Sequence, residues 1–301
     1  MDEGKDLYLK KASVLVEALP YIKEYFNKIV VVKLGGSMME KSLKLQKVLD
    51  DITLMKFVGI KVVLIHGGGK QITELMEEKN IDVKFVDGLR VTTPESMKIV
   101  QMVLLGNINT NIVKLLNKHG NSAVGICGND GNFIECEKKF YFKDNKKIDL
   151  GLVGDIRSID SSFIKDILDN NLIPVIASLG TDRKGDLYNI NADTCASQIA
   201  IALKAEKMIL LTDVDGILDK EGNKERLVSK LDTSSCLEMI RSGKIGTGMI
   251  PKVKACTDSL EGGVGRTHIL NGTKTHSILI EIFTDRGIGT MIVKEGDTDG
   301  L

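Results

Sequence analysis

Short runs of apolar, β-branched residues recur along this chain and alternate with longer stretches of helical spacing. The apolar runs are IVVVK (29–33), KVVLI (61–65), SAVGIC (122–127), IPVIA (173–177) and KMILLT (207–212). The helical stretches lie at 70–79, 94–117, 161–170 and 192–204. A continuous apolar run is typical of a strand buried on both faces, and strands joined through helices run parallel. The sequence therefore predicts an α/β fold whose mainly parallel sheet is covered by helices on both sides.

Two further segments bear on domain organisation. Residues 5–27 carry an apolar stripe at helical spacing, and Pro20 should kink this helix. This apolar stripe either packs on its own domain or pairs with another subunit, and the spacing of the residues does not distinguish the two. Residues 128–160 are polar and predict hairpins and loops near a domain junction. We expect a helical extension at 1–27, an N-terminal lobe at 28–180 and a C-terminal lobe at 181–301.

Composition excludes several classes of function. Lys and Arg number 41 and Asp and Glu number 41, so no net charge draws the chain to nucleic acid or an anionic membrane. Aromatic residues make up 4% and tryptophan is absent, which disfavours base stacking. The five cysteines are scattered without a CxxC pair, which predicts reduced thiols and no metal site. No apolar run approaches about 18 residues, and the N-terminus is too charged for a secretory signal. We therefore expect a cytoplasmic protein.

Glycine-rich loops follow the first two strand runs directly. Gly35 and Gly36 come after 29–33, and residues 67–69, all glycine, come after 61–65. Without a Cβ, glycine lets backbone N–H groups approach an anion, and the positive end of a following helix adds to the attraction. Two such loops on successive strands favour phosphate or carboxylate binding over simple tight turns. Neither GxxxxGK[ST] nor a GxGxxG after a strand occurs, so a P-loop enzyme is excluded and a dinucleotide-dependent dehydrogenase is disfavoured.

Charged residues at the loop positions are the candidates for chemistry. Lys33 ends a strand just before its glycines, and Lys252 follows a glycine-bearing loop, so the two could stabilise a migrating phosphoryl group. Asp193 either caps the helix 194–204 or holds the two ammonium groups in place, and these roles are compatible. Arg90 could bind a carboxylate or form a surface ion pair. We expect His66 to shape its loop, because phosphorylation of an ionised carboxylate requires no base.

Six motifs occur in the order of one known family. They are VVVKLGGS (30–37), VLIHGGG (63–69), DGLRVT (87–92), NINAD (189–193), LLTDVDGIL (210–218) and TGMIPK (247–252). Together they resemble the amino acid kinase family, and HGGG with GLRVT and NxNAD narrows the likeness to acetylglutamate kinases or their acetylaminoadipate relatives. The resemblance runs from about residue 12 to 294. It implies a three-layer αβα sandwich in which the N-terminal lobe binds the acyl substrate and the C-terminal lobe binds ATP.

The resemblance also implies a role for each candidate residue. Lys33 and Lys252 would stabilise the migrating γ-phosphoryl group of ATP, and Asp193 would orient both lysines. The substrate's γ-carboxylate would be bound by backbone N–H groups of Gly68 and Gly69, and its α-carboxylate end by Arg90 and Asn189. The nucleotide, with Mg²⁺ on its phosphates, would be bound by Gly35, Gly36, Asp213, Val214, Asp215, Gly216, Ile217, Leu218, Ile245 and Gly246. From the sequence pattern, Asp213 and Asp215 could alternatively be turn residues.

Two features resemble the arginine-inhibited branch of these kinases. One is the N-terminal helix ending in EALPYIKEYF (17–26), which in that branch links dimers into a hexamer. The other is the C-terminal pattern that would surround L-arginine, contributed by Tyr21, Lys207, His268, Glu281 and Gly287. The expected activity is phosphorylation of the γ-carboxylate of N-acetyl-L-glutamate, the second step of arginine biosynthesis, under arginine feedback.

Three matters remain open at the level of sequence. A kinase for a related carboxylate such as N-acetyl-aminoadipate fits the same motifs, and a non-catalytic arginine-sensing subunit is an alternative of another class. A nitrogen-signalling protein is a possible partner, although Asn107 and Asn129 stand where lysine is frequent in the family. A plastid location would apply in a photosynthetic eukaryote.

Overall fold

The centre of the molecule is a mixed but mainly parallel sheet. The computed structural model describes residues 12–39, 42–144, 146–221, 224–285 and 287–297. Within these residues the sheet has eight strands in the order β14-β16-β15-β11-β1-β2-β8-β5. Their bounds are β1 (Ile29–Leu34), β2 (Lys61–His66), β5 (Ala123–Cys127), β8 (Ile173–Ala177), β11 (Lys207–Thr212), β14 (Lys230–Asp232), β15 (Arg266–Asn271) and β16 (Thr290–Val293). The strands from β15 to β5 run parallel, and β16 pairs antiparallel with β15.

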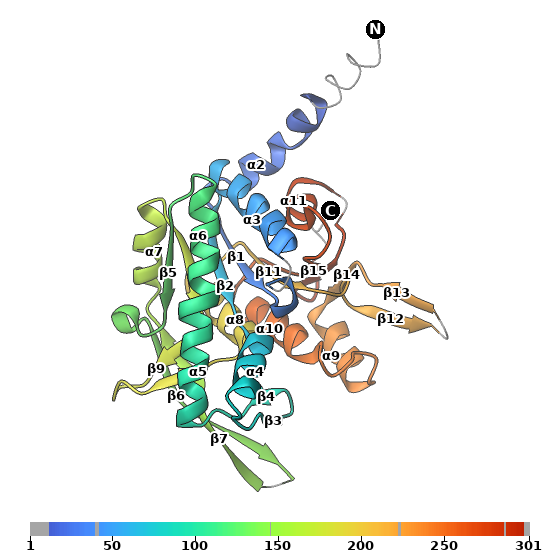
Figure 1. Cartoon of the computed structure of the whole chain (residues 1–301). Helices are drawn as coiled ribbons and strands as arrows, with labels where there is room; N and C mark the ends of the chain where they lie inside the picture. The colour runs from blue at the N-terminus through green and yellow to red at the C-terminus, as the bar shows by residue number, and fades with distance from the viewer. Residues whose placement is uncertain (1–11, 40–41, 145, 222–223, 286, 298–301) are drawn as a thin grey trace.

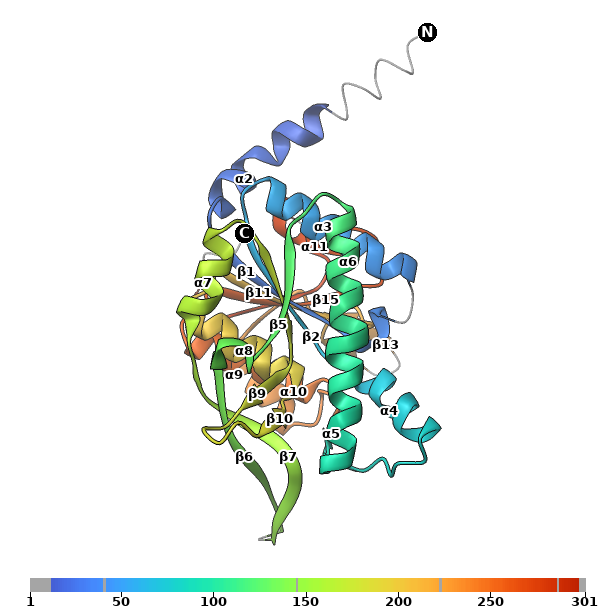
Figure 2. The same cartoon turned by 60° about the vertical axis from the view of Figure 1, so that its left-hand side comes forward.

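Helices cover both faces of this sheet (Figures 1 and 2). One layer holds α3 (Ser42–Phe57), α4 (Gly69–Glu78), α5 (Pro94–Gln101), α6 (Thr110–Lys118) and α11 (Ser277–Phe283). The other holds α7 (Ser161–Asp169), α8 (Ala192–Leu203), α9 (Thr233–Arg241) and α10 (Ile250–Glu261). Strand side chains alternate between the layers, so Val30 and Val32 pack with the first and Val31 with the second. The predicted three-layer αβα sandwich is confirmed.

The N-terminal helix is interrupted where proline was expected to disturb it. Residues 12–17 are helical, Ala18 is a turn residue, and α2 (Leu19–Tyr25) follows. Pro20 lies in the first turn of α2, where its missing N–H costs no helical hydrogen bond. The segment before α2 projects from the body of the molecule (Figure 1) and leaves Val14 and Leu15 61% and 75% exposed. The stripe of residues 12–17 therefore does not dock on its own chain.

The helical stretch predicted at 94–117 is present and is more apolar than we expected from the sequence. Pro94–Lys118 is continuous through a π-helical segment, η2 (Met102–Asn109), and its length and mean hydropathy of 1.3 would suffice to cross a membrane. However, 44% of the apolar window is buried, and the run packs on β5 and β8 through Val103, Leu104 and Leu116. Core packing accounts for its hydropathy.

The polar stretch after β5 forms hairpins, as predicted. Strands β6 (Ile134–Lys143) and β7 (Lys146–Ile159) pair antiparallel, and β9 (Leu179–Thr181) and β10 (Leu187–Asn189) join them in a second, smaller sheet. A short hairpin of β3 (Phe85–Val86) and β4 (Leu89–Arg90) lies nearby, and a hairpin of β12 (Leu218–Glu221) and β13 (Lys224–Leu227) lies beside the C-terminal half. The two expected lobes share the one large sheet.

The π-helical segment places a buried amide against the sheet. The Asn109 Nδ2 group donates to the Val175 carbonyl oxygen at 2.8 Å and to His66 Nε2 at 3.1 Å. Asn109→Ala leaves both acceptors without this donor, so we expect the free energy of unfolding to fall by about 1–3 kcal/mol in urea denaturation. The matched control is Asn107→Ala, because Asn107 is exposed on the same segment. Equal stability of the two variants would contradict this account.

Candidate active site

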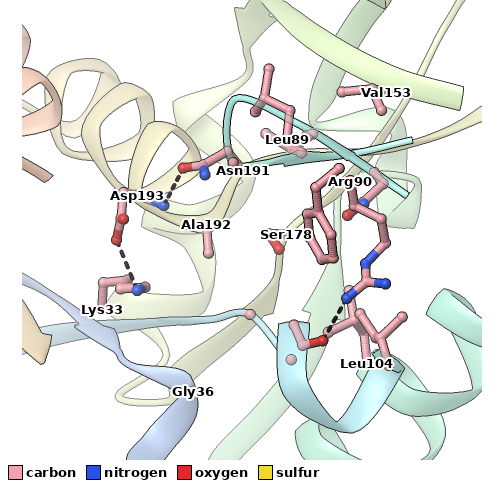
Figure 3. Close-up of a pocket in the computed structure, with 18 of the residues that line it drawn as sticks. Lys33, Gly36, Leu89, Arg90, Leu104, Val153, Ser178, Asn191, Ala192 and Asp193 are labelled. Carbon is pink, nitrogen blue, oxygen red and sulfur yellow. Dashed lines mark hydrogen bonds and ion pairs between the residues drawn. The ribbon is translucent and has the colours of Figure 1, made fainter. Parts of the chain in front are cut away.

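A buried carboxylate joins two lysines from different parts of the chain. Lys33 lies on β1 and faces α8, because Val31, two residues earlier, packs on that side. Its Nζ is 2.8 Å from Asp193 Oδ1, and the Nζ of Lys252 is 3.2 Å from Asp193 Oδ2 (the first contact is drawn in Figure 3). The side chains of Lys33 and Asp193 are 8% and 7% exposed, and that of Lys252 is 20% exposed. The structure thus brings the three predicted residues together.

The electrostatics of this cluster favour an anionic ligand. Burial raises the pKa of Asp193, but the neighbouring ammonium groups of Lys33 and Lys252 outweigh that effect and hold the pKa below its usual value. Asp193 therefore stays ionised, and two cations against one anion leave one formal positive charge. In a site shielded from water, that charge attracts a phosphate or carboxylate more strongly than it would at the surface.

The capping role considered for Asp193 is wrong. Asn191 is the N-cap of α8, and its Oδ1 accepts hydrogen bonds from the N–H groups of Asp193 at 2.9 Å and Thr194 at 3.0 Å. Asp193 lies within the first helical turn instead, with its carboxylate turned to the lysines. Because Asn and Asp are both good caps, the NINAD motif alone could not show which residue fills that position.

The glycine loop after β2 forms one wall of a cavity at the carboxyl end of the sheet. Helix α4 begins at Gly69, and its first N–H groups have no partner inside the helix. A Cβ on Gly68 would come within 2.6 Å of Ile108 Cδ1 and 2.8 Å of Leu104 Cδ2, so another residue there would displace these side chains of the π-helical segment. Gly67, Gly68 and Gly69 all line the cavity, together with Lys33 and Asp193.

His66 orients this loop, as the sequence suggested. Its Nε2 accepts from Asn109, and its Nδ1 lies 3.2 Å from the Gly67 carbonyl oxygen, a pattern that fits the neutral ring with the proton on Nδ1. Burial lowers the pKa of His66 to about 4, so the ring is neutral at physiological pH. Both nitrogens are occupied, which leaves the ring no role as a base.

Arg90 lies across the same cavity, on β4. Its Nη2 donates to the Gly69 carbonyl oxygen and to Thr73 Oγ1, each at 2.6 Å, and its Cζ lies over the Phe85 ring, 4.6 Å from the ring centroid. Figure 3 shows Arg90 at the cavity. The group is buried, which lowers the pKa of Arg90, and no carboxylate in the described ranges pairs with it. The surface ion pair considered from the sequence is therefore wrong. A buried guanidinium beside a cavity is suited to a carboxylate ligand.

The other predicted substrate and nucleotide residues occupy neighbouring positions. Asn189 lines the cavity and donates to Thr92 Oγ1 at 3.3 Å. Gly36 also lines it, whereas Gly35 packs so closely on β11 that a Cβ would come within 2.6 Å of the Leu211 carbonyl oxygen. The cavity measures about 200 Å³, which suits a small molecule and is too small to hold a whole nucleotide as well.

The loop after β11 is partly structural. Asp215 accepts from Asn271 Nδ2 at 2.7 Å and pairs with Lys274 at 2.9 Å, and these contacts lower its pKa. Ile217 is buried, and its N–H donates to Thr290 Oγ1. By contrast, Asp213 and Val214 are exposed at the carboxyl edge of the sheet. The other predicted nucleotide residues are close in sequence to this loop or to Lys252; they are Gly216, Leu218, Ile245 and Gly246. Their contact with a nucleotide stays a prediction.

A second cavity of about 320 Å³ lies near the amino ends of β11 and β15. It is lined by all the residues that the sequence assigned to an effector, namely Tyr21, Lys207, His268, Glu281 and Gly287. His268 Nδ1 is 2.7 Å from Glu281 Oε1, and the Lys207 ammonium lies over the Tyr25 ring at 4.9 Å. Burial lowers the pKa of His268 to about 4 and that of Lys207 to about 8. Glu281 is held ionised, because His268 and Lys207 outweigh the effect of burial on its pKa.

The model of one protein family, the amino acid kinase family, matches residues 28–271. The chain belongs to this family. A curated acetylglutamate kinase from Halothermothrix orenii is 49% identical over 288 residues, which make up 95% of this chain and 98% of that protein. Membership of the family agrees with the three-layer fold and makes ATP the expected phosphoryl donor.

Two solved structures of another enzyme have a similar fold. N-acetylglutamate synthase from Neisseria gonorrhoeae, complexed with coenzyme A and N-acetyl-glutamate, superposes with a TM-score of 0.84 at 28% identity. The match covers 95% of this chain and 64% of that chain. The same synthase complexed with coenzyme A and L-arginine gives a TM-score of 0.80 at 26% identity over 94% of this chain and 65% of that chain.

Sequence reasoning missed three contributors to this kinase site. Asn109 reaches His66 from the π-helical segment, Phe85 stacks on Arg90, and Thr73 accepts from Arg90. The motif DGLRVT begins just after Phe85, so that residue lay outside the pattern. Thr73 lies four residues after Gly69, one turn along α4, a spacing that could have placed it beside the loop.

Asp193→Asn should lower kcat of this kinase at least about 100-fold, because a neutral amide no longer holds two ammonium groups together at the site of charge transfer. Coupled ADP release measures kcat, and circular dichroism checks the fold. The matched control is Asp166→Asn, on the exposed side of α7. A kcat within a few-fold of wild type would remove Asp193 from the catalytic machinery.

Proposed function

We propose that this chain transfers the γ-phosphoryl group of ATP to the γ-carboxylate of N-acetyl-L-glutamate, yielding N-acetyl-L-glutamyl 5-phosphate. In this role the protein would catalyse the second step of arginine biosynthesis. The observation that carries the proposal is the Lys33–Asp193–Lys252 cluster beside the glycine N–H cradle and Arg90. The identity and near-complete coverage shared with the H. orenii acetylglutamate kinase support it.

Substrate binding follows from the two anion sites of the cavity. The N–H groups at the start of α4, contributed by Gly68 and Gly69, hold the γ-carboxylate beside Lys33. Arg90, with Asn189, holds the α-carboxylate end on the far side of the cavity. A dicarboxylate is thereby fixed at both ends, and its reactive oxygen faces the lysine cluster. Such positioning is the main task of a phosphoryl-transfer enzyme.

The reaction itself needs charge stabilisation and no protein base. A γ-carboxylate oxygen attacks the γ-phosphorus of ATP in line, an O–P bond forms, and the bond to the bridging oxygen breaks to release ADP. The carboxylate is already ionised, so no proton is removed. Lys33 and Lys252 offset the negative charge on the transferring group, and Asp193 keeps them in position.

The nucleotide would lie on the C-terminal side of the lysine cluster. Asp213, Val214 and the start of α10 lie at the edge of the sheet beyond β1, and Lys252 extends from α10. The described residues contain no cluster of three or more His, Cys, Asp or Glu that could hold a metal ion. Mg²⁺ would instead arrive on the phosphates of ATP and neutralise part of their charge.

We further propose that L-arginine inhibits the enzyme by binding in the second cavity. Glu281 is an ionised, buried carboxylate that could pair with the guanidinium, and Lys207 could pair with the α-carboxylate. A Cβ at Gly287 would come within 3.0 Å of Glu281 Oε2, so glycine keeps that carboxylate accessible. The structure of the related synthase with L-arginine supports an effector of this chemistry.

The N-terminal helix would serve assembly into a hexamer of three dimers. Its apolar residues at 14–16 are exposed and do not pack in the core of their own chain. Exposed apolar surface of this kind is typical of a protein–protein interface. The same helix contributes Tyr21 to the second cavity, so assembly and arginine binding would share one element.

A substrate panel tests the activity. With ATP and coupled ADP release, we expect turnover of N-acetyl-L-glutamate to exceed that of N-acetyl-L-aminoadipate, L-glutamate and L-aspartate by at least about 10-fold in kcat/KM, since one extra methylene alone changes binding by roughly 1–3 kcal/mol. Faster turnover of any of the others would overturn the substrate assignment. Arginine binding with no turnover of any acceptor would indicate a sensing subunit instead of an enzyme.

Glu281→Gln tests the effector site. We expect the arginine concentration for half-inhibition to rise at least about 10-fold, because a charge-assisted pair with the guanidinium is lost, while kcat without arginine stays near wild type. The matched control is Glu95→Gln, an exposed residue in the first turn of α5. A dose-response curve that does not move would place arginine elsewhere.

A further inference from the structure

Ser178 lies at the carboxyl edge of the sheet, one residue past the end of β8. The strand register pairs Leu34 with His66 and His66 with Ala177, so Ser178 follows in line with the glycine loop. Ile176, two residues before Ser178, packs on the α8 side of the sheet. By the alternation of strand side chains, Ser178 faces that same side, where Lys33 also lies.

Ser178 is a buried residue whose hydroxyl is open to the cavity, and that hydroxyl makes no hydrogen bond to another group in the described part of the chain. The residue is 2% exposed and lines the substrate cavity. Figure 3 shows its oxygen directed into the cavity between Ala192 and Arg90. By contrast, the neighbouring Asn191 is occupied as the cap of α8. A hydroxyl that faces the substrate cavity without a protein partner is free to donate a hydrogen bond to a substrate group.

The position of Ser178 indicates which substrate group its hydroxyl would contact. Neighbouring strands are about 4.8 Å apart, so β8 lies about 10 Å from the strand of Lys33, with β2 between them. An extended N-acetyl-L-glutamate spans about 6 Å from its γ-carboxyl carbon to its acyl carbon, because five bonds of about 1.5 Å follow a zigzag. With the γ-carboxylate in the glycine cradle on β2, the α-carbon end of the molecule reaches β8.

Two groups are present at that end, and they differ in the partner they need. The α-carboxylate is a charged group suited to the buried guanidinium of Arg90. The acyl oxygen is a neutral acceptor, for which a single hydroxyl donor suffices. Apolar side chains of Leu89, Leu104 and Val153 also line the cavity and suit an acyl methyl group.

We propose that Ser178 is a specificity-determining residue whose hydroxyl donates a hydrogen bond to the acyl carbonyl oxygen of the N-acylated substrate. The assignment rests on the proposed function and adds to it the group that recognises the acyl substituent. Ser178 thereby favours acylated over free amino acids.

The test compares two ligands on two variants by isothermal titration calorimetry. The first ligand is N-acetyl-L-glutamate, and the second is the matching enantiomer of 2-propylglutarate, which keeps both carboxylates and replaces the acetamido group with three carbons. Ser178→Ala removes an unpaired hydroxyl and should not unfold the chain. Ser277→Ala is the matched control, because Ser277 is buried on α11 and its hydroxyl also lacks a partner.

We expect Ser178→Ala to weaken N-acetyl-L-glutamate binding about 5- to 10-fold, as for loss of one neutral hydrogen bond, and to leave 2-propylglutarate binding unchanged. Ser277→Ala should change neither. Equal weakening of both ligands would assign the hydroxyl to the α-carboxylate and overturn the proposal, as would no change in either. A wild-type protein that fails to bind N-acetyl-L-glutamate would overturn the proposed function itself, a result distinct from an unaffected Ser178→Ala variant.

Discussion

The carboxylate of Asp193, buried between two ammonium groups, sets the requirements that the rest of the molecule meets. An isolated buried carboxylate costs several kcal/mol in lost hydration, and removing one partner of a buried pair leaves the other uncompensated. The contacts of 2.8 and 3.2 Å therefore require β1, α8 and the start of α10 to be held rigidly together. The continuous sheet with helices packed on both faces supplies that rigidity. Because it is held rigidly, the cluster presents a fixed positive charge to an anion, and its side chains need not reorganise during the reaction.

Much of this arrangement can be predicted from the sequence, because it depends on local patterns. Apolar runs of strand length indicated the parallel strands, and glycines directly after two of them marked the edge where ligands bind. The positions of Lys33, Asp193 and Lys252 beside loops suggested a shared role, and the motif resemblance implied their close approach, since Lys33 and Lys252 are 219 positions apart and give no spacing signal. Periodicity alone would have left each lysine a surface residue.

Other parts of the site depend on tertiary contacts that no local pattern encodes. Asn109 reaches His66 from the end of the π-helical segment η2, and no local sequence pattern predicts such a segment. Thr73 and Phe85 belong to the site because both contact the Arg90 guanidinium, Thr73 as a hydrogen-bond acceptor and Phe85 through its ring. Ser178 follows an apolar strand and looks like any turn serine in the sequence. The helix at 94–118 was predicted from its spacing, but the sheet against which its apolar residues pack could not be predicted from that spacing.

The two cavities lie at opposite edges of the same sheet, one at the carboxyl ends of β1 and β2 and the other at the amino ends of β11 and β15, which bears on how an effector could act. Lys207 begins β11, and Thr212 ends it beside the catalytic edge, about 17 Å away at about 3.3 Å per residue. A buried central strand does not stretch, so an effector at one end acts by moving whole elements relative to each other. Helices α2 and α11 contribute Tyr21 and Glu281 to the effector cavity and no residue to the substrate cavity, so theirs is the placement that arginine would affect directly. The proposed coupling between arginine and substrate is reciprocal for binding affinity. A substrate that favours one placement of α2 and α11 must therefore weaken arginine binding by the same factor by which arginine weakens substrate binding.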